Sequence, residues 1–184
     1  MKGRPIGSII RNRIAAILNH VDISYGYEVY KIYKEFFGQV HIRTIYYNLK
    51  KGIEKEEIIL FKIEKELGDY SWGNEVEKIY YAIGPYANIE LPVKDLEIIE
   101  KIPKNSLKKS IDINWENELK NMTESLKKEI IEYNERYNVL SNQGKKLLKE
   151  KINQKYNKLK EYFGSKIKKE KFQELLKDIN PPTP

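Results

Sequence analysis

The stretch from Ser24 to Lys51, SYGYEVYKIYKEFFGQVHIRTIYYNLKK, contains two short helical patterns. The first pattern runs to Gly38, and the second begins near Arg43. Two helices joined through a glycine predict a helix-turn-helix. The second pattern is basic and rich in hydrogen-bond donors, and a helix of that kind fits the major groove of DNA.

Apolar residues at spacings of three and four also precede this stretch. They predict a first helix over about residues 8–20, with Ser8 as its N-cap. Ser24 is the expected N-cap of the second helix, over about residues 25–37, and Gly38 can adopt the positive φ that ends it. In the third helix, Ile42, Ile45 and Leu49 share one face.

The opposite face of the third helix is predicted to carry the residues that contact nucleic acid. These are Arg43, Thr44, Tyr47, Asn48 and Lys51. Arginine suits guanine, asparagine suits adenine, lysine suits backbone oxygens, and threonine and tyrosine suit phosphates or methyl groups. The alternative interpretation is an ordinary solvated helix face.

Four further basic residues near the amino terminus are candidates for backbone contact. They are Lys2, Arg4, Arg11 and Arg13. Arg11 and Arg13 are equally compatible with ordinary surface positions, and both interpretations are open.

The period changes to two after the third helix. Alternation over residues 58–63 and again over residues 79–83 predicts a β-hairpin, with a long loop containing turns between the two strands. Three helices followed by a hairpin is the order of a winged helix-turn-helix. Gly84-Pro85, Pro92 and a polar stretch from Pro103 predict a boundary near residue 90, and so domains over residues 1–90 and 91–184.

Residues 91–184 are predicted to be helical. Apolar residues from Trp115 to Leu140 follow steps of three and four, Asn142-Gln143-Gly144 offers a stop, and Gly164 separates a last short helix. The narrow apolar seam suits a coiled coil or a helical hairpin, so the arms either fold back on each other or pair with a second chain. We favour self-association, which makes a homodimer the expected state. The Pro-rich tail from Pro181 is expected to be disordered.

Three motifs together carry a resemblance to a known family. They are Tyr25-Gly26-Tyr27-Glu28-Val29, Thr44-Ile45-Tyr46 followed by Leu49, and Tyr80-Tyr81 at the end of the second strand. Over about residues 8–84 the sequence resembles the PadR-like winged helix-turn-helix transcriptional regulators. The resemblance implies a DNA-binding module whose third helix reads an operator, a dimerising carboxyl-terminal helical region and, in many members, a regulatory ligand between the two.

Charge is distributed unevenly along the chain. The formal net charge of +7 over 184 residues divides into +6 for residues 1–52, −5 for residues 53–92 and +6 for residues 93–184. A basic total favours anionic partners. The acidic middle segment contains the hairpin, and we therefore expect the wing to stay out of a deep minor groove because phosphates repel it.

Several classes of protein are excluded by what the sequence lacks. There is no cysteine, and no apolar run approaches the roughly 20 residues of a membrane span. His20 and His41 have no partners at ligand spacing, and no phosphate-binding or nucleophile motif is present. We expect a cytoplasmic protein that is not an enzyme, with no membrane partner, no metal and no cofactor.

The function that this sequence predicts is sequence-specific regulation of transcription through double-stranded DNA. The alternative is a non-enzymatic adaptor that binds RNA or a protein through the winged domain and basic helices. Residues 145–171 carry eleven basic and three acidic side chains, which suits nucleic acid but is also typical of a solvated helix.

Overall fold

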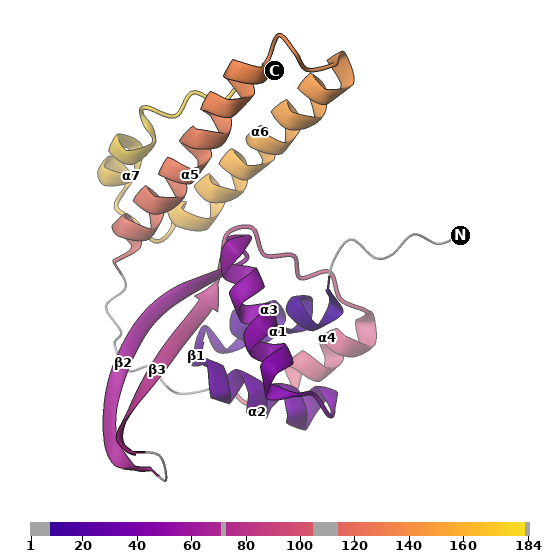
Figure 1. Ribbon diagram of the computed structural model, residues 1–184, viewed down its shortest axis with the longest axis vertical. Helices are drawn as coiled ribbons and strands as arrows, with labels where there is room; N and C mark the ends of the chain where they lie inside the picture. Colours follow the sequence, from indigo (N-terminus) through magenta and orange to yellow (C-terminus); the bar gives the residue numbers. More distant parts are fainter. Residues whose placement is uncertain (1–7, 71–72, 105–113, 183–184) are drawn as a thin grey trace. The chain divides into compact units, whose positions relative to one another are not determined.

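The computed structural model describes residues 8–70, 73–104 and 114–182, and the chain divides into two compact units, residues 1–111 and 112–184 (Figure 1). The fold is mainly helical, with one antiparallel sheet in the first unit and only helices among the described residues of the second. None of the described helices combines the length and apolar character that a membrane span needs.

Three helices open the first unit: α1 (Ile9–Val21), α2 (Gly26–Phe37) and α3 (Ile42–Glu54). Ser8 is the N-cap of α1 as predicted, because its hydroxyl oxygen accepts a hydrogen bond from an amide of the first turn. Gly38 ends α2 with a φ of 92°, a conformation that glycine adopts at little cost. The prediction that Ser24 caps α2 is wrong: Tyr25 is the N-cap, and the Ser24 hydroxyl donates to Glu28 at 2.7 Å.

A three-stranded antiparallel sheet completes the helix-turn-helix. Its strands are β1 (Ile23–Tyr25), β2 (Ile58–Tyr70) and β3 (Gly73–Ile83), in the order β1-β3-β2. β1 was not predicted, since three residues are too few to show an alternating pattern. The hairpin of β2 and β3 projects from the helices as a wing, so the predicted winged helix-turn-helix order is confirmed (Figure 1).

The wing is longer than the sequence predicted. Strand pairing continues to Tyr70 opposite Gly73, where a long loop was expected. Register shifts lie between Leu60 and Lys62 and again before Tyr70. The outer part of the wing has no core to face, and Leu67 is 81% exposed there. Backbone pairing and cross-strand ion pairs therefore extend the hairpin, and no apolar stripe in the sequence predicts this extension.

The core of the first unit is built around α1. Ile14, Ile17 and Leu18 are fully buried, and they pack with Ile45 and Leu49 of α3. Burying a side chain of this size is worth about 1.5–3 kcal/mol relative to leaving it in water. The apolar face predicted for α3 is thus used to fix this helix against α1.

A further helix, α4 (Val93–Glu100), also belongs to the first unit. Ile99 and Ile102 are buried in the same core cluster, so the chain continues to pack on α1 after Pro92. The first compact unit accordingly extends beyond residue 90 and includes α4.

The second unit contains α5 (Trp115–Arg136), α6 (Asn142–Gly164) and α7 (Lys169–Leu176). The long helices α5 and α6 lie side by side in a helical hairpin, and α7 packs against both (Figure 1). The two long helices therefore fold back on each other within one chain, one of the two arrangements that the sequence left open. Leu119, Leu126, Ile152, Leu159 and Phe163 form the buried seam.

One expectation for this unit is wrong. Asn142, Gln143 and Gly144 were expected to stop a helix, but they form the first turn of α6, with Ser141 as the N-cap. In the Pro-rich tail, for which disorder was predicted, the Pro182 carbonyl accepts a hydrogen bond from Asn153 at 3.2 Å. The last two residues of that tail lie outside the described part of the chain.

Candidate nucleic-acid interface

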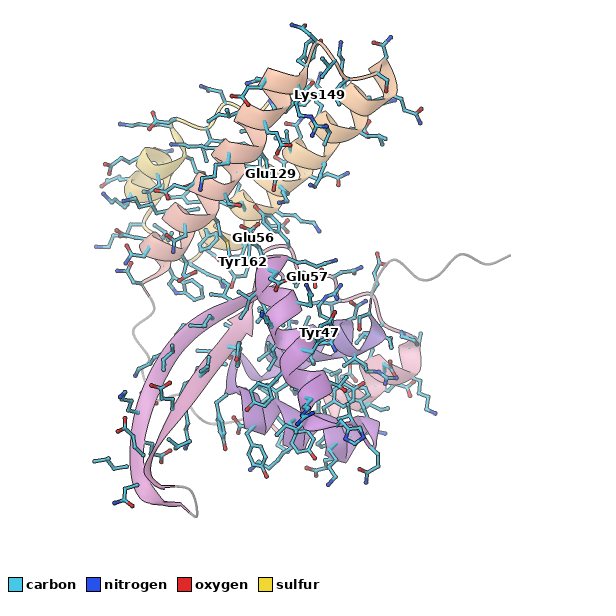
Figure 2. The ribbon with its side chains drawn as sticks, viewed as in Figure 1. Tyr47, Glu56, Glu57, Glu129, Lys149 and Tyr162 are labelled. Atoms are coloured by element: carbon cyan, nitrogen blue, oxygen red, sulfur yellow. The ribbon has the colours of Figure 1, made fainter. Side chains whose placement is uncertain are left out.

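The outer face of α3 is exposed, and one stripe along it is basic and aromatic. Arg43, Tyr47 and Lys50 recur at spacings of four and three and are all exposed, Tyr47 by 61%. Figure 2 labels Tyr47 on this helix. At 1.5 Å per residue, Arg43 and Lys50 lie about 10 Å apart along the axis, which is about three base-pair steps. Within the described part of the chain, neither cation forms an ion pair with a carboxylate.

Asn48, which was predicted on this face, lies on the opposite one. It is only 5% exposed, its amide donates to the Thr44 carbonyl at 2.8 Å, and its oxygen accepts from the Ser8 hydroxyl at 3.0 Å. Asn48 is three residues after the buried Ile45 and four before the buried Gly52, so helical spacing alone could have placed it. The residue fixes the start of α1 to α3 and cannot reach a base edge without breaking both bonds.

Arg11 and Arg13 of α1 are also engaged within the first unit. Arg11 is 8% exposed and pairs with Glu57, just before β2. Arg13 binds both carboxylate oxygens of Asp95 in α4, at 2.8 and 3.0 Å. It also donates to the Tyr33 hydroxyl at 3.3 Å, and its guanidinium lies 4.7 Å from the centre of the Phe37 ring.

Through these contacts Arg11 and Arg13 join α1 to other elements of the first unit. The sequence had also allowed them to form a basic patch for backbone contact. The bidentate bond to Asp95 raises the pKa of Arg13 above its ordinary value, so its charge is permanent at any working pH. Lys2 and Arg4 lie outside the residues that the structure describes.

The two remaining predicted residues occupy the edges of the exposed stripe. Thr44 is half-buried. The Lys51 ammonium pairs with Glu54 one turn later, at 2.6 Å, and this bond raises the pKa of Lys51 and lowers the pKa of Glu54. Lys51 therefore has an ion-pair partner that a phosphate would have to displace. Lys50 forms no ion pair among the described residues, although its charge also lowers the pKa of Glu54.

Two residues of this face were missed by the sequence analysis. Lys50 follows Tyr47 by three residues, and Tyr46 follows Arg43 by three, so the helical period indicated both. Tyr46 is 41% exposed. Its ring lies so close to the start of α2 that a Cβ added to Gly26 would approach it to 2.7 Å. Gly26 is thus required for the close approach of the α3 tyrosine.

An open pocket of about 680 Å³ adjoins this face, between α3, the start of α2 and strand β3. Its polar lining includes Tyr25, Tyr27, Tyr46 and Lys78. Burial, and then the charges of the other two phenols, raise the pKa of Tyr46 above its usual value. The Tyr46 hydroxyl therefore keeps its proton at neutral pH and can act as a hydrogen-bond donor.

The wing is less acidic than the sequence segment that contains it. The hairpin itself, residues 58–83, carries three basic and five acidic side chains, and the rest of the −5 lies outside the strands. Ion pairs join Lys62 to Glu64, Lys65 to Glu75 and Lys78 to Glu66. Repulsion of phosphates by the wing is correspondingly smaller than the sequence segment suggested.

No cluster of three or more potential metal ligands is found in the described ranges 8–70, 73–104 and 114–182. The fold and the exposed α3 define a winged helix-turn-helix protein. No family model matches the sequence, and no curated protein matches it. Among solved structures, the chain is similar to that of Bacillus subtilis PadR in complex with operator DNA, with 15% identity, a TM-score of 0.33, and coverage of 90% of this chain and 100% of that one.

Proposed function

We propose that this chain is a sequence-specific DNA-binding regulator of transcription and that α3 is its recognition helix. The observation that carries the proposal is the outer stripe of α3, where Arg43, Tyr47 and Lys50 are exposed and neither cation forms an ion pair among the described residues. Exposed cations without ion pairs on a fixed helix add little to folding, but they suit an anionic ligand.

The buried face of α3 holds the exposed stripe in a fixed position. Ile45 and Leu49 are fully buried against α1, and Asn48 ties α3 to the start of α1. A recognition helix held in this way enters a major groove without first having to be ordered, so little binding energy is lost. Arg43 is the residue that we assign to a guanine edge, Lys50 to a backbone oxygen and Tyr47 to a phosphate or a thymine methyl group.

The regulator is proposed to act as a homodimer, with one recognition helix for each half-site. The hairpin of the second unit exposes large apolar side chains at and near its turn, including Val139 at 81% and Leu147 at 59%. Apolar side chains in such positions gain by burial against a second copy. Light scattering on the purified protein tests this directly, and a mass of one 21.9 kDa chain at the concentrations that bind DNA would contradict it.

The experiment that tests the function is a titration against random-sequence duplex DNA and structured RNA at several salt concentrations. It is followed by sequence selection on whichever nucleic acid binds. Enrichment of an inverted repeat with a preference for duplex DNA is the expected result, and the distance between its half-sites gives the geometry of the dimer. Failure to enrich any motif, or tighter binding to RNA, would overturn the proposal.

One observation favours a second candidate, an adaptor that binds RNA or an acidic partner. Residues 145–171, most of which belong to α6 and α7, carry a net charge of +8. Lys146, Lys149 and Lys158 have no ion-pair partner within the described residues (Figure 2 labels Lys149). An RNA preference in the same titration, with no motif selected on DNA, is the result that this candidate predicts.

A further inference from the structure

We propose that the pocket between the wing and α3 binds a backbone phosphate of the DNA, and that Glu66 on the neighbouring strand holds the ammonium of Lys78 in the free protein. The inference rests on the proposed function and assigns residues that the sequence analysis did not. The residues are Lys78 of β3, Tyr46 of α3 and Tyr27 of α2, which line one open pocket. We call this pocket the phosphate pocket.

The phosphate pocket lies beside the proposed recognition helix, because α3 contributes a residue to both. Tyr46 lines the pocket and is also on the recognition helix, one residue before Tyr47. A duplex docked on the outer stripe of α3 must pass its sugar-phosphate backbone beside that helix, and the pocket is the recess on the side of the wing. Its cavity of about 680 Å³ is large enough for a phosphate and part of its sugar.

Part of the lining, which also includes Val76 and Ile79, can bind an anion. The Lys78 ammonium supplies a positive charge at the base of the wing, 5.0 Å from the centre of the Tyr25 ring. Tyr46 supplies a hydroxyl that keeps its proton, since burial raises its pKa, and Tyr27 is an exposed phenol at the same opening. Phenol hydroxyls and ammonium groups are common donors to DNA phosphates.

In the free protein the ammonium of Lys78 is held by Glu66 on the neighbouring strand. The hydrogen bond to Glu66 is the main reason that the pKa of Lys78 is raised. Both side chains are partly exposed, so the pair is a weak one that a phosphate can exchange. Glu77 also lines the pocket, and its charge opposes the phosphate. Binding therefore requires Lys78 to change partners, from a carboxylate to a phosphate.

The same wing supplies a matched control. Lys65 and Glu75 form the equivalent diagonal pair, with an Nζ–Oε1 distance of 2.9 Å. Alternation along β2 places Lys65 on the opposite face of the hairpin from Glu66, the face that it shares with Glu77, and Lys65 itself does not line the pocket. Neutralising Lys65 changes the net charge of the wing by the same amount as neutralising Lys78.

The test is a salt titration of full-length protein on selected and on random duplex DNA. Lys78→Gln is expected to weaken binding to both DNAs by the same factor, about three- to tenfold, and to lower the slope of log affinity against log salt by about 0.9. Glu66→Gln is expected to tighten binding to both about two- to fivefold, the range of an exposed ion pair. Tyr46→Phe, which keeps the ring over Gly26, is expected to weaken both, whereas Lys65→Gln is expected to leave both unchanged.

Three results would overturn the inference. The first is an unchanged DNA affinity of Lys78→Gln when Arg43→Ala still loses its base preference. That result would contradict phosphate binding in the pocket and leave the proposed function intact. An equal loss in Lys65→Gln and Lys78→Gln would assign the effect to net charge and not to this pocket. Absence of duplex binding by the unaltered protein would overturn the proposed function and the pocket together.

Discussion

Arg43 and Asn48 stand five residues apart on α3, but their surroundings are opposite. Arg43 is exposed, and Asn48 is buried with both ends of its amide hydrogen-bonded. Residue type alone suits both to base recognition, since arginine pairs with guanine and asparagine with adenine. Burial distinguishes the two residues: the Arg43 side chain is accessible to the proposed DNA ligand, whereas Asn48 is engaged in the fold.

Replacing Arg43 with alanine is expected to weaken binding to the selected operator and to relax the preference at one base position. Loss of a bidentate contact to a guanine costs about 1–3 kcal/mol of discrimination. The unfolding free energy should change little, because the guanidinium has no ion-pair partner in the described part of the chain. Competition binding against operators changed at single positions measures this. A uniform loss on every sequence would reassign Arg43 to backbone contact.

Replacing Asn48 with alanine is expected to show the reverse pattern. The Ser8 hydroxyl loses its acceptor and the interior of the α1–α3 contact loses a polar side chain, which costs about 1–3 kcal/mol of stability. The base preference of the protein that remains folded should be unchanged. Urea unfolding and operator selection on this variant check the two halves of the prediction. Altered base preference at unchanged stability would return Asn48 to the recognition surface.

At the scale of the element, the junction between α3, β2 and the end of β3 depends on one glycine. A Cβ added to Gly84 would lie 2.4 Å from the backbone carbonyl oxygen of Glu56, which has a φ of 57°. Side chains can rotate away from such a contact, but this backbone is held, because the Gly84 amide donates to the Glu57 carbonyl at 2.8 Å.

Gly84→Ala is therefore expected to destabilise the first unit by about 1–3 kcal/mol, the usual cost of overpacking a fixed site. The measurement is the urea midpoint of the full-length protein. Gly164→Ala is the matched control, because no atom lies within 4 Å of an added Cβ at the end of α6. It should be neutral or stabilising by up to about 1 kcal/mol. Equal effects of the two substitutions would show that the Glu56 contact is not what constrains Gly84.

The helices were predictable from the sequence because each carries an apolar stripe that local spacing reveals, as from Ile10 to Val21 in α1. The outer wing was not, since charged residues occupy both of its faces and Leu67 has nothing to pack against. The contacts of Arg11 and Arg13 were also hidden, because their partners Glu57 and Asp95 are distant in sequence and meet them only in the fold.

A carboxylate in α5 is another group whose environment the sequence did not reveal. Partial burial raises the pKa of Glu118 above its ordinary value of 4.5, and Glu118 in turn adds to the raised pKa of Tyr162. A carboxyl group whose folded pKa is raised favours folding when protonated. Its contribution is therefore fully present below the unfolded pKa and is lost as the pH rises through the folded pKa.

Glu118→Gln is consequently expected to raise the stability of the protein at about pH 7 and to change it little at about pH 4, where the native carboxyl is largely protonated. The gain is limited because the carboxylate lies in the first turn of α5, where the helix dipole favours it. Urea unfolding at the two pH values measures the difference. Glu116→Gln, an exposed neighbour in the same turn, is the control and should show no such pH-dependent gain. A gain of equal size at both pH values would contradict the assignment to burial.

At the scale of the whole molecule, the two units carry two separate basic surfaces, and the two candidate functions differ in which one binds nucleic acid. A regulator that reads DNA through α3 uses the first unit, so the lysines of α6 should add nothing to its salt dependence. An RNA-binding adaptor uses the second unit. Each phosphate contact contributes about 0.9 to the slope of log affinity against log salt on duplex DNA, which makes the slope a count of the cations involved.

Replacing Lys146, Lys149 and Lys158 together with glutamine is expected to leave the affinity for the operator and its salt slope unchanged. These lysines have no ion-pair partner in the described part of the second unit, so the triple variant should also keep its stability. The matched measurement is Lys50→Gln on α3, where a drop of about 0.9 in the slope is expected. A smaller slope in the triple variant with no change in Lys50→Gln would assign nucleic-acid binding to the helical unit and replace the regulator with the adaptor.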